Sequence, residues 1–402
     1  MAKTSKPAQG RPYLAIPGPS VMPDAVLRAM HRAAPNIYAG ELPEMMPGLV
    51  TDLKRIARTD HNLAMYIGNG HAAWEASLSN VLKPGDRVLV PATGRFGLGW
   101  AQMGKSLGLE TEIIDFGRQS PMDMDRIAEA LKADTAHNIK AVLAVHVDTA
   151  TSIRNDIAAL RGVLDDVQHP ALLMADCIAS LGCDVFEMDA WGVDVMVTGC
   201  QKGLMVPPGM AFVFFNDRAE AARARMPRVS WYWDWTPRAH PEEFFQYHGG
   251  TAPTHHLYGL RTALTMIHDE GIEQVWARHR LLARAVWAAC EAWSTAGTFR
   301  MNVSDPAYRS CAVTALRLQS PHATELRSWV EQELGLTLGI GLGMAEPGDP
   351  ARDGFFRLGH MGHTNGHMIM GLLGGIEAGM RAMKVEHGPG ALEAAADVIA
   401  GA

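Results

Sequence analysis

The sequence has 402 residues, more than one ordinary hydrophobic core encloses, so two domains are expected. Hydrophobic residues make up 48% and charged residues 20%, which indicates a soluble globular protein, and no apolar run is long enough to cross a membrane. The formal net charge of −7 argues against a nucleic-acid or anionic-membrane partner. Five cysteines without a CxxC pair, and a polar first stretch without a signal-peptide core, predict a cytoplasmic protein with reduced thiols.

Short apolar runs alternate with amphipathic segments between about residues 63 and 215. The expected strands are Leu63–Ile67, Arg87–Val90, Ala141–Val147, Ala171–Asp176, Val193–Thr198 and Met210–Phe215. The expected helices between them are Ala72–Leu82, Gly99–Leu107, Asp123–Lys132 and Ile157–Val167. Nearly continuous apolar strands that alternate with helices predict an α/β fold with a mostly parallel sheet covered on both faces. In such sheets, ligands bind at the carboxyl ends of the strands.

The pattern changes after about residue 251. Helices are expected over about 255–296, over Thr324–Leu334, from about residue 364 and over Gly390–Ala402, and strands over Cys311–Arg317 and Phe355–Gly359. This predicts a compact α+β second domain, joined by the N-terminal arm. The expected divisions are an arm over residues 1–22, a large domain over 23–255 and a smaller C-terminal domain over 256–402.

Two charged residues close buried strands. Asp176 ends one apolar run, and Lys202 follows the next one in the turn Gly-Cys-Gln-Lys-Gly. A lysine beside a buried strand costs desolvation free energy unless its amine is neutralised, paired or used covalently. The pair suits pyridoxal phosphate, because a carboxylate can keep the pyridine nitrogen protonated while a lysine forms a Schiff base with the aldehyde. The alternative is that Asp176 caps a helix and Lys202 is solvated.

Polar and aromatic residues follow other strands at the same expected edge. The turn Gly-Asn-Gly-His71 opens a helix, and free N–H groups at a helix N-terminus favour an anion, although the turn has neither GxGxxG nor P-loop spacing. Phe96 could stack on a flat heterocycle or lie in the core. Thr149 and Thr151 could bond a cofactor oxygen or cap the next element.

Arg357 places a positive charge inside an apolar strand. Its guanidinium can donate two parallel hydrogen bonds to a substrate carboxylate, although an internal Asp or Glu would also serve as its partner. Glycines interrupt the segment that holds His360, His363 and His367, and no HExxH motif accompanies it, so no metal site is expected. The aromatic stretch from Trp231 to Trp235 is expected at an interface or at the mouth of the site.

With these residues in this order, the chain resembles the class V aminotransferases of the alanine–glyoxylate and serine–glyoxylate type, which have the fold-type I pyridoxal-phosphate architecture. The similarity runs from Ile16-Pro-Gly-Pro-Ser20 to Arg357-Leu-Gly-His-Met-Gly362. Its most specific motif is Thr198-Gly-Cys-Gln-Lys202-Gly, followed by Pro207-Pro-Gly209.

By position, the resemblance implies that Lys202 is the Schiff-base lysine, Asp176 the pyridinium partner and Arg357 the carboxylate-binding residue. The other cofactor contacts that it implies are Asn69, Gly70, His71, Phe96 at the ring, Thr149, and Gln201 at the phosphate. In this family a neighbouring subunit completes the phosphate site, and His248 and Thr251 fall at that place. The resemblance therefore implies a homodimer with a shared active site, and it leaves a tetramer open.

The implied reaction moves an amino group from a small amino acid, such as serine, alanine or aspartate, to a 2-oxoacid, with glyoxylate as the expected acceptor. The segment Pro35–Glu41, in which Tyr38 is expected to touch substrate, replaces an Asp-His-Arg stretch common in relatives, so the donor stays open. Arg95-Phe-Gly97 resembles the ureidoglycine–glyoxylate branch, and Gly359-His-Met-Gly362 the pyridoxamine–pyruvate branch.

Two other classes compete with this interpretation. A lyase or cysteine desulfurase on the same scaffold would need a reactive cysteine, whereas Cys177 and Cys200 stand in apolar contexts that indicate structural roles. A non-catalytic scaffold that binds metal through the histidine segment would bind no pyridoxal phosphate.

Overall fold

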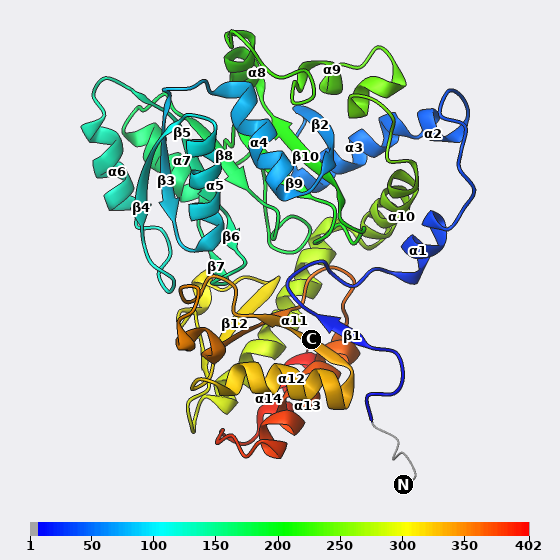
Figure 1. Cartoon of the computed structure of the whole chain (residues 1–402), viewed down its shortest axis with the longest axis vertical. Helices are drawn as coiled ribbons and strands as arrows, with labels where there is room; N and C mark the ends of the chain where they lie inside the picture. The colour runs from blue at the N-terminus through cyan, green and yellow to red at the C-terminus, as the bar shows by residue number, and fades with distance from the viewer. Residues whose placement is uncertain (1–6, 402) are drawn as a thin grey trace.

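The computed structural model describes residues 7–401 and contains two large sheets, one in each half of the view in Figure 1. The first six residues of the predicted N-terminal arm, and Ala402 of the predicted terminal helix, lie outside the described residues. Within the described residues, no helix combines the length and the apolar character that crossing a bilayer requires.

The larger sheet has seven strands in the order β2-β10-β9-β8-β5-β3-β4. Their bounds are β2 Asn62–Gly68, β10 Gly209–Phe215, β9 Val195–Gly199, β8 Leu172–Asp176, β5 Ile139–Val145, β3 Arg87–Ala92 and β4 Glu110–Asp115. All pairings are parallel except those of β10, which is antiparallel to both β2 and β9. The predicted α/β class and the mostly parallel sheet are thus confirmed.

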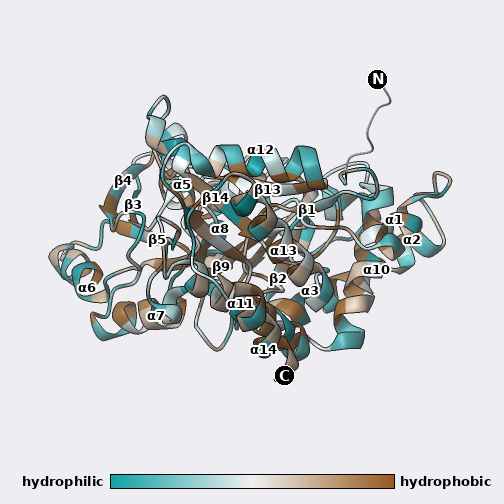
Figure 2. Cartoon of the chain, turned by 90° about the horizontal axis from the view of Figure 1, so that it is seen from below, coloured by the Kyte–Doolittle hydropathy of each residue, from teal (hydrophilic) through white to brown (hydrophobic). Residues whose placement is uncertain are grey.

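Alternate residues of the central strands enter two different cores. Phe212 and Phe214 of β10 belong to one core, and Val213 and Phe215 to the other. The first core is completed by α3 (Met46–Ala57), α6 (Met124–Ala133), α7 (Ile157–Asp166) and α10 (Thr254–Glu270); the second is completed by α4 (Gly70–Val81), α5 (Arg95–Ser106), α8 (Asp217–Ala224) and α9 (Thr236–Ala239). In Figure 2 the strands at the centre are largely brown, in keeping with burial on both faces.

The smaller sheet has five strands in the order β1-β13-β14-β12-β11. Their bounds are β1 Tyr13–Ala15, β13 Leu336–Ile340, β14 Phe355–Gly359, β12 Val313–Arg317 and β11 Arg300–Met301. Its core is shared with α11 (Ile272–Trp293), α12 (His322–Leu334), α13 (Gly366–Ala382) and α14 (Ala391–Ala400). The N-terminal segment that was predicted to join the second domain contributes β1, which pairs with β13.

The two halves are connected through long helices. The predicted division after residue 255 falls in the first turn of α10, whose apolar residues Leu257 and Leu264 pack in a core of the large sheet. The next helix, α11, begins in that core with Ile272 and ends in the core of the small sheet with Trp293. The exact domain boundaries stay a prediction.

Several elements differ from the sequence-based expectation. β4 was not predicted because its sequence ETEIID alternates exposed acids with half-buried residues, as an edge strand does. The predicted strand Ala141–Val147 stops at Val145, after which β6 (Val147–Asp148) pairs with β7 (Ile153–Arg154). The helix expected from Gly99 begins at Arg95. The helical stretches expected over about 255–296 are α10 and α11, which meet at Gly271.

The remaining short elements connect these layers. They are α1 Asp24–Met30, α2 Glu41–Glu44, η1 Phe244–His248, η2 Pro306–Tyr308 and η3 Pro350–Gly354.

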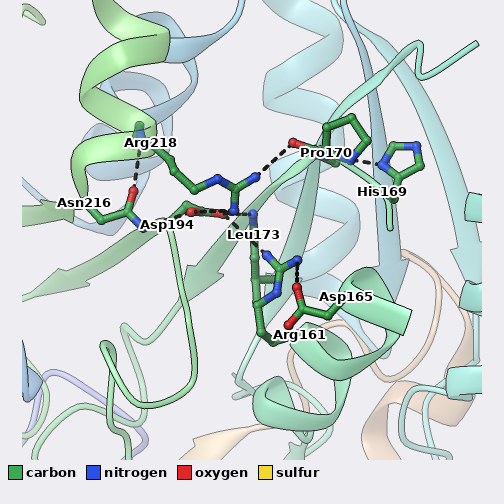
Figure 3. Close-up of polar contacts among 10 residues, drawn as sticks. Arg161, Asp165, His169, Pro170, Leu173, Asp194, Asn216 and Arg218 are labelled. Carbon is green, nitrogen blue, oxygen red and sulfur yellow. Dashed lines mark hydrogen bonds and ion pairs between the residues drawn. The ribbon is translucent and has the colours of Figure 1, made fainter. Parts of the chain in front are cut away.

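A buried carboxylate fixes the start of β9. Asp194 has no exposed surface and accepts hydrogen bonds from the backbone N–H of Leu173 at 2.7 Å, from the Asn216 amide at 2.9 Å and from Arg218 at 3.0 Å (Figure 3). Arg161 of α7 approaches from the other side at 3.8 Å. These contacts join β8, β9, α7 and α8 at the end of β9 opposite to Lys202.

Candidate active site

Asp176 lies at the carboxyl end of β8 and is 3% exposed. Its Oδ1 accepts the Ile178 backbone N–H at 2.7 Å, and its Oδ2 accepts the indole N–H of Trp74 at 2.9 Å. Burial raises the pKa of Asp176 to about 7, although both hydrogen bonds and the nearby Lys202 act in the opposite direction. Asp176 caps no helix, so the alternative to the catalytic interpretation does not describe it.

Lys202 follows β9 in the turn that leads into Gly203 and the two prolines before β10. Its Nζ donates a hydrogen bond to the carbonyl oxygen of Pro17 at 2.5 Å. Burial, and secondarily the positive charge of Arg357, lowers the pKa of Lys202 to about 8. The amine is therefore not a solvated surface lysine, and a larger fraction of it is neutral near physiological pH than for an exposed lysine.

Asp176 and Lys202 line one cavity of about 220 Å³. Its other lining residues are Asn69, Gly70, His71, Trp74, Phe96, Val147, Thr149, Ile178, Ala179 and Gln201. The structure thus brings eight of the ten predicted cofactor contacts to one small space, at the carboxyl ends of the parallel strands.

The rim of this cavity is the N-terminus of α4. Asn69 is the N-cap residue, and its side chain accepts the backbone N–H of His71 at 3.0 Å. The positive end of the helix dipole and the unpaired N–H groups of the first turn make this rim suitable for an anion. Burial, and secondarily Arg95, lowers the pKa of His71, which favours its neutral form.

Phe96 stands in the first turn of α5, where its backbone N–H donates to Oδ2 of Asp148 at 2.8 Å. Asp148 is fully buried and also accepts the backbone N–H of Ala150 at 3.0 Å. This carboxylate therefore joins the start of α5, with Phe96, to the turn that carries Thr149. Thr151, by contrast, is buried in this turn and donates to the Asp148 carbonyl oxygen at 3.4 Å, so its hydroxyl serves the turn.

Arg357 of β14 lies behind Thr149 and is 6% exposed. Its Nη1 donates to the carbonyl oxygen of Thr149 at 2.7 Å and its Nε to that of Ile340 at 2.7 Å. Burial lowers the pKa of Arg357 to about 10, while the charge of Asp148 raises it. Among residues 7–401 it forms no direct salt bridge with a carboxylate, but the buried carboxylate of Asp148 interacts with it electrostatically, so the internal-acid alternative stays open.

A wider cleft of about 1460 Å³ adjoins the small cavity and shares His71, Trp74 and Phe96 with it. Charged side chains from both halves of the molecule line it: Arg95, Arg118, Arg317, Arg327, Arg352, Asp115, Glu346 and Asp353. Arginines outnumber the acids, and only the Arg118–Glu346 pair among these charges forms a salt bridge within residues 7–401, at 3.1 Å. The approach to the cavity is therefore electropositive, which favours carboxylate ligands.

Four predicted site residues do not line this cavity within one chain, and one of them is Arg357, which lies behind Thr149. Tyr38 is 89% exposed in the loop between α1 and α2. Thr251 is exposed just before α10. His248 is buried at the end of η1, where burial lowers its pKa to about 3, and neither ring nitrogen has a hydrogen-bond partner within the described residues.

Other residues singled out in the sequence have structural roles. The His360 ring is buried and bonds the Thr314 hydroxyl and the Cys311 carbonyl oxygen, both at 2.9 Å. Trp235 lies in the core, stacked on Phe215 with ring centroids 4.1 Å apart, so the aromatic stretch is not wholly at an interface; Trp231 at its other end is 69% exposed.

The two cysteines beside the site are buried. Burial raises the pKa of Cys200 to about 11 and that of Cys177 well above its usual range, so neither carries the thiolate that a desulfurase requires.

Two residues of the site were missed by the sequence analysis. The carbonyl oxygen of Pro17 accepts a hydrogen bond from Nζ of Lys202, although the two residues are far apart in the sequence. The indole N–H of Trp74 donates a hydrogen bond to the Asp176 carboxylate. A signal existed for Trp74, because it follows His71 by one helical turn and so shares a face with the helix start. No local pattern marks Pro17.

These groups fit pyridoxal phosphate. The buried carboxylate of Asp176 would be stabilised by a protonated ring nitrogen, the helix start would hold a phosphate, and Lys202 has an amine of lowered pKa for an aldehyde. The Gln201 Oε1 atom is buried without a partner among residues 7–401, as expected for a group that faces a ligand. Together with the sheet topology, this site defines a pyridoxal-phosphate-dependent transferase.

The sequence comparisons give the family. The model of the family "Aminotransferase class-V" matches residues 59–352, and the chain belongs to this family. It is an aminotransferase, and its cofactor is pyridoxal phosphate. The predicted resemblance is confirmed.

Individual relatives cover nearly the whole chain. A serine–glyoxylate aminotransferase from Arabidopsis thaliana is 34% identical over 92% of this chain and 90% of its own. The solved structure of a pyridoxamine–pyruvate aminotransferase from Mesorhizobium loti has a TM-score of 0.87 at 24% identity, with 98% of each chain covered. That of a ureidoglycine–glyoxylate aminotransferase from Bacillus subtilis has a TM-score of 0.84 at 24% identity, with 99% of each chain covered. At these identities, the two structures show the shared fold.

Proposed function

We propose that this aminotransferase moves the amino group of a small amino acid, such as serine, alanine or aspartate, to glyoxylate, with Lys202 and Asp176 as its catalytic residues. The observation that carries the assignment is the single cavity that both side chains line. When bound there, pyridoxal phosphate supplies an aldehyde that takes up the amino group and a ring that accepts the electron pair left when Cα loses its proton.

Lys202 would hold the cofactor through its amine, and a substrate amine would replace it there. Its neutral Nζ then removes the proton from the substrate Cα, and its protonated form returns a proton on the cofactor side. A general base works best when its pKa lies near the working pH, and burial lowers the pKa of Lys202 to about 8. The Pro17 carbonyl oxygen offers the released amine a fixed acceptor.

Asp176 keeps the ring nitrogen protonated, because the ion pair between a buried carboxylate and a pyridinium stabilises both partners. Phe96 and Thr149 line the same cavity, so an aromatic ring and a hydroxyl donor would be available to the cofactor ring. Asn69, Gly70 and His71 at the start of α4, together with Gln201, would hold its phosphate.

Arg357 binds the α-carboxylate of both substrates. Its guanidinium is 6% exposed, and within residues 7–401 no carboxylate forms a direct salt bridge with it, although the buried Asp148 acts on it at longer range. A substrate carboxylate can supply the direct ionic partner. Tyr38 contacts the variable end of the substrate, and the arginine-rich cleft raises the local concentration of carboxylate substrates.

The phosphate site is completed by a second copy of the chain, so the enzyme acts as a homodimer, which can pair further into a tetramer. Two observations support this. Thr251 is exposed, as a residue must be to reach another subunit. Nearby His248 has two ring nitrogens without a partner within the described residues, which fits a group whose partner lies outside its own chain.

Other donors and acceptors compete with this assignment. The folds shared with a pyridoxamine–pyruvate and a ureidoglycine–glyoxylate aminotransferase make those substrate pairs the nearest alternatives. The family membership also leaves a lyase or desulfurase on the same fold as a rival, although the protonated cysteines beside the site speak against a desulfurase.

A half-reaction screen tests the proposal. The purified protein with its cofactor is mixed with one amino acid at a time while the visible absorbance is followed, and glyoxylate or pyruvate is then added. We expect serine, alanine or aspartate to bleach the band, and glyoxylate to restore it with formation of glycine. Release of ammonia or sulfide without a new amino acid would identify a lyase or desulfurase instead. In a separate assay, amino transfer from pyridoxamine to pyruvate, with none from the amino acids, would assign the protein to the pyridoxamine–pyruvate type.

A further inference from the structure

We infer that Trp74 is a positioning residue for Asp176: its indole N–H holds the carboxylate ionised and oriented toward the cofactor ring. The inference rests on the proposed role of Asp176 and extends it to a residue with no assigned function in the proposed reaction.

The contact is direct and enclosed. The Trp74 Nε1 atom lies 2.9 Å from Oδ2 of Asp176, and the two residues are 1% and 3% exposed. The Ile178 backbone N–H occupies Oδ1 at 2.7 Å, so each carboxylate oxygen has its own donor. Rotation of the carboxylate would break one of these hydrogen bonds in a place that water does not reach, and this fixes its plane.

The indole ring is itself held firmly. It stacks on Trp100 with ring centroids 6.0 Å apart and planes inclined by 14°, and it meets the edge of Phe96 at 6.3 Å. Gly99 faces the same ring, and a Cβ at that position would lie 3.4 Å from it. The N–H direction is therefore set by packing before the cofactor binds.

Trp74 also connects the two ends of the proposed cofactor site. It stands one turn after His71 in α4, the helix whose first residues form the proposed phosphate rim. One helix, α4, thus carries both the proposed phosphate rim and the indole N–H that bonds Asp176. We expect the distance between the rim and Asp176 to match the distance between the phosphate and the ring nitrogen of the cofactor.

The charge around Asp176 explains why a donor is needed. Burial and the neighbouring carboxylate of Asp148 both favour the protonated acid, whereas Lys202 and the two hydrogen bonds favour the carboxylate. Cys177, the next residue in the chain, has a pKa raised well above its usual range by burial and stays neutral. Burial lowers the pKa of His71, at the rim of the same cavity, which favours its neutral form. Without the indole N–H, Asp176 would take up a proton at higher pH and lose its hold on a protonated ring nitrogen.

Trp74→Phe tests the inference, because it keeps an aromatic ring and removes the donor. Trp100→Phe is the matched control: Trp100 is equally buried in the same stack, but its Nε1 has no partner among the described residues. We expect Trp74→Phe to weaken pyridoxal phosphate binding about tenfold or more, as loss of a hydrogen bond to a charged group does. Trp100→Phe keeps an aromatic ring in the stack and the Trp74 donor in place, so it should weaken binding several times less. The dissociation constant is measured by equilibrium dialysis across the neutral pH range.

The pH dependence separates this role from simple packing. In Trp74→Phe the acid-side loss of cofactor affinity should move to higher pH, whereas a packing defect would weaken binding equally at all pH values. Incorporation of 3-benzothienylalanine at position 74 replaces only the N–H by sulfur, and it should reproduce the effect with the ring shape kept.

A double-mutant cycle with Asp176→Asn completes the test. If Trp74 acts through Asp176, Trp74→Phe should cost little in the Asp176→Asn background. Equal behaviour of the Trp74→Phe and Trp100→Phe proteins, or additive losses in the cycle, would overturn the inference. A wild-type protein that binds no pyridoxal phosphate, or an Asp176→Asn protein that binds it normally, would instead overturn the proposed function.

Discussion

The carbonyl oxygen of Pro17, in the N-terminal arm, accepts a hydrogen bond from Nζ of Lys202 at 2.5 Å. The same arm forms β1 in the small sheet, where Tyr13 pairs with Leu336. Three residues past Pro17, Ser20 bonds the turn of Lys202 twice, through its hydroxyl to the Lys202 carbonyl at 2.7 Å and through its N–H to that of Gln201 at 2.9 Å. The arm therefore links the small sheet directly to the lysine.

The first prediction concerns Gly18, which follows Pro17 at φ +92°. A Cβ at this position would collide with the Lys202 side chain, so Gly18→Ala should displace the amine and slow its reaction with pyridoxal phosphate by about tenfold or more, as misplacement of a reacting group does. Gly40→Ala is the control, because Gly40 has φ +87° and open space around its Cβ position. If both variants took up the cofactor equally slowly, backbone strain and not the collision with Lys202 would explain the slower reaction of Gly18→Ala.

The second prediction concerns the pH dependence of cofactor uptake. Only the neutral amine attacks an aldehyde, and the pKa of Lys202 is lowered from 10.5 to about 8. The neutral fraction is then about a tenth at pH 7 and most of the total at pH 9, so the uptake rate should rise through this range and level off above it. Stopped-flow absorbance of the apoprotein mixed with pyridoxal phosphate measures the rate. A rate that still rises steeply at pH 10 would indicate an ordinary solvated lysine.

Lys202→Ala is the control for this measurement. It removes the amine, so the protein should show no visible Schiff-base absorbance at any pH, although it keeps the proposed phosphate site at the start of α4. Visible absorbance with normal turnover in this variant would assign the Schiff base to another residue.

The third prediction concerns Arg357. Arg357→Ala should raise KM for the amino acid and for the oxoacid by about tenfold to a hundredfold, because a charge-assisted hydrogen bond to the carboxylate is lost. Arg357→Lys keeps the positive charge but loses the two parallel N–H donors of the guanidinium, so it should recover part of the affinity for the substrate carboxylate. The cofactor dissociation constant of each variant shows whether the hydrogen bond to the Thr149 carbonyl, and with it the cofactor site, is intact. Unchanged KM and kcat would mean that another residue holds the carboxylate.

The fourth prediction concerns the shared active site. Chains with Lys202→Ala and chains with Thr251→Ala should each form impaired homodimers, the first without the amine and the second with weak phosphate binding. In a hybrid dimer, one site carries both changes and the other carries neither, so random mixing should restore about a quarter of wild-type activity. Absence of recovery after subunit exchange, verified by mass spectrometry, would show that Thr251 serves its own chain.

The sequence alone predicts the features of this site that local chemistry determines. Asp176 and Lys202 each close an apolar strand, and because β8 and β9 are parallel neighbours, their carboxyl ends meet at one edge of the sheet. Asn69, Gly70 and His71 follow the same logic at the start of α4.

What sequence reasoning missed depends on contacts between distant segments. The Pro17 carbonyl is a backbone group with no side-chain signature, and it reaches Lys202 only because β1 joins the small sheet. The edge strand β4 has charged residues that resemble a surface loop. The antiparallel placement of β10 is invisible in its composition, because a strand buried on both faces is apolar in either direction.

The last prediction separates stability from catalysis. Asp194 is fully buried, and its carboxylate contacts two arginines and two N–H groups, one from the Leu173 backbone and one from the Asn216 side chain. Asp194→Ala should therefore lower the free energy of unfolding by about 3–5 kcal/mol, as removal of one partner from a buried charge network does. Asp165→Ala is the control, because it removes a carboxylate that is 65% exposed from the same Arg161 and should cost less than about 1 kcal/mol. Urea denaturation measures both. Since Asp194 precedes β9 and Lys202 follows it, the folded fraction of Asp194→Ala should keep a normal affinity for pyridoxal phosphate, and a loss of affinity equal to that of a site variant would mean that this network also shapes the cofactor cavity.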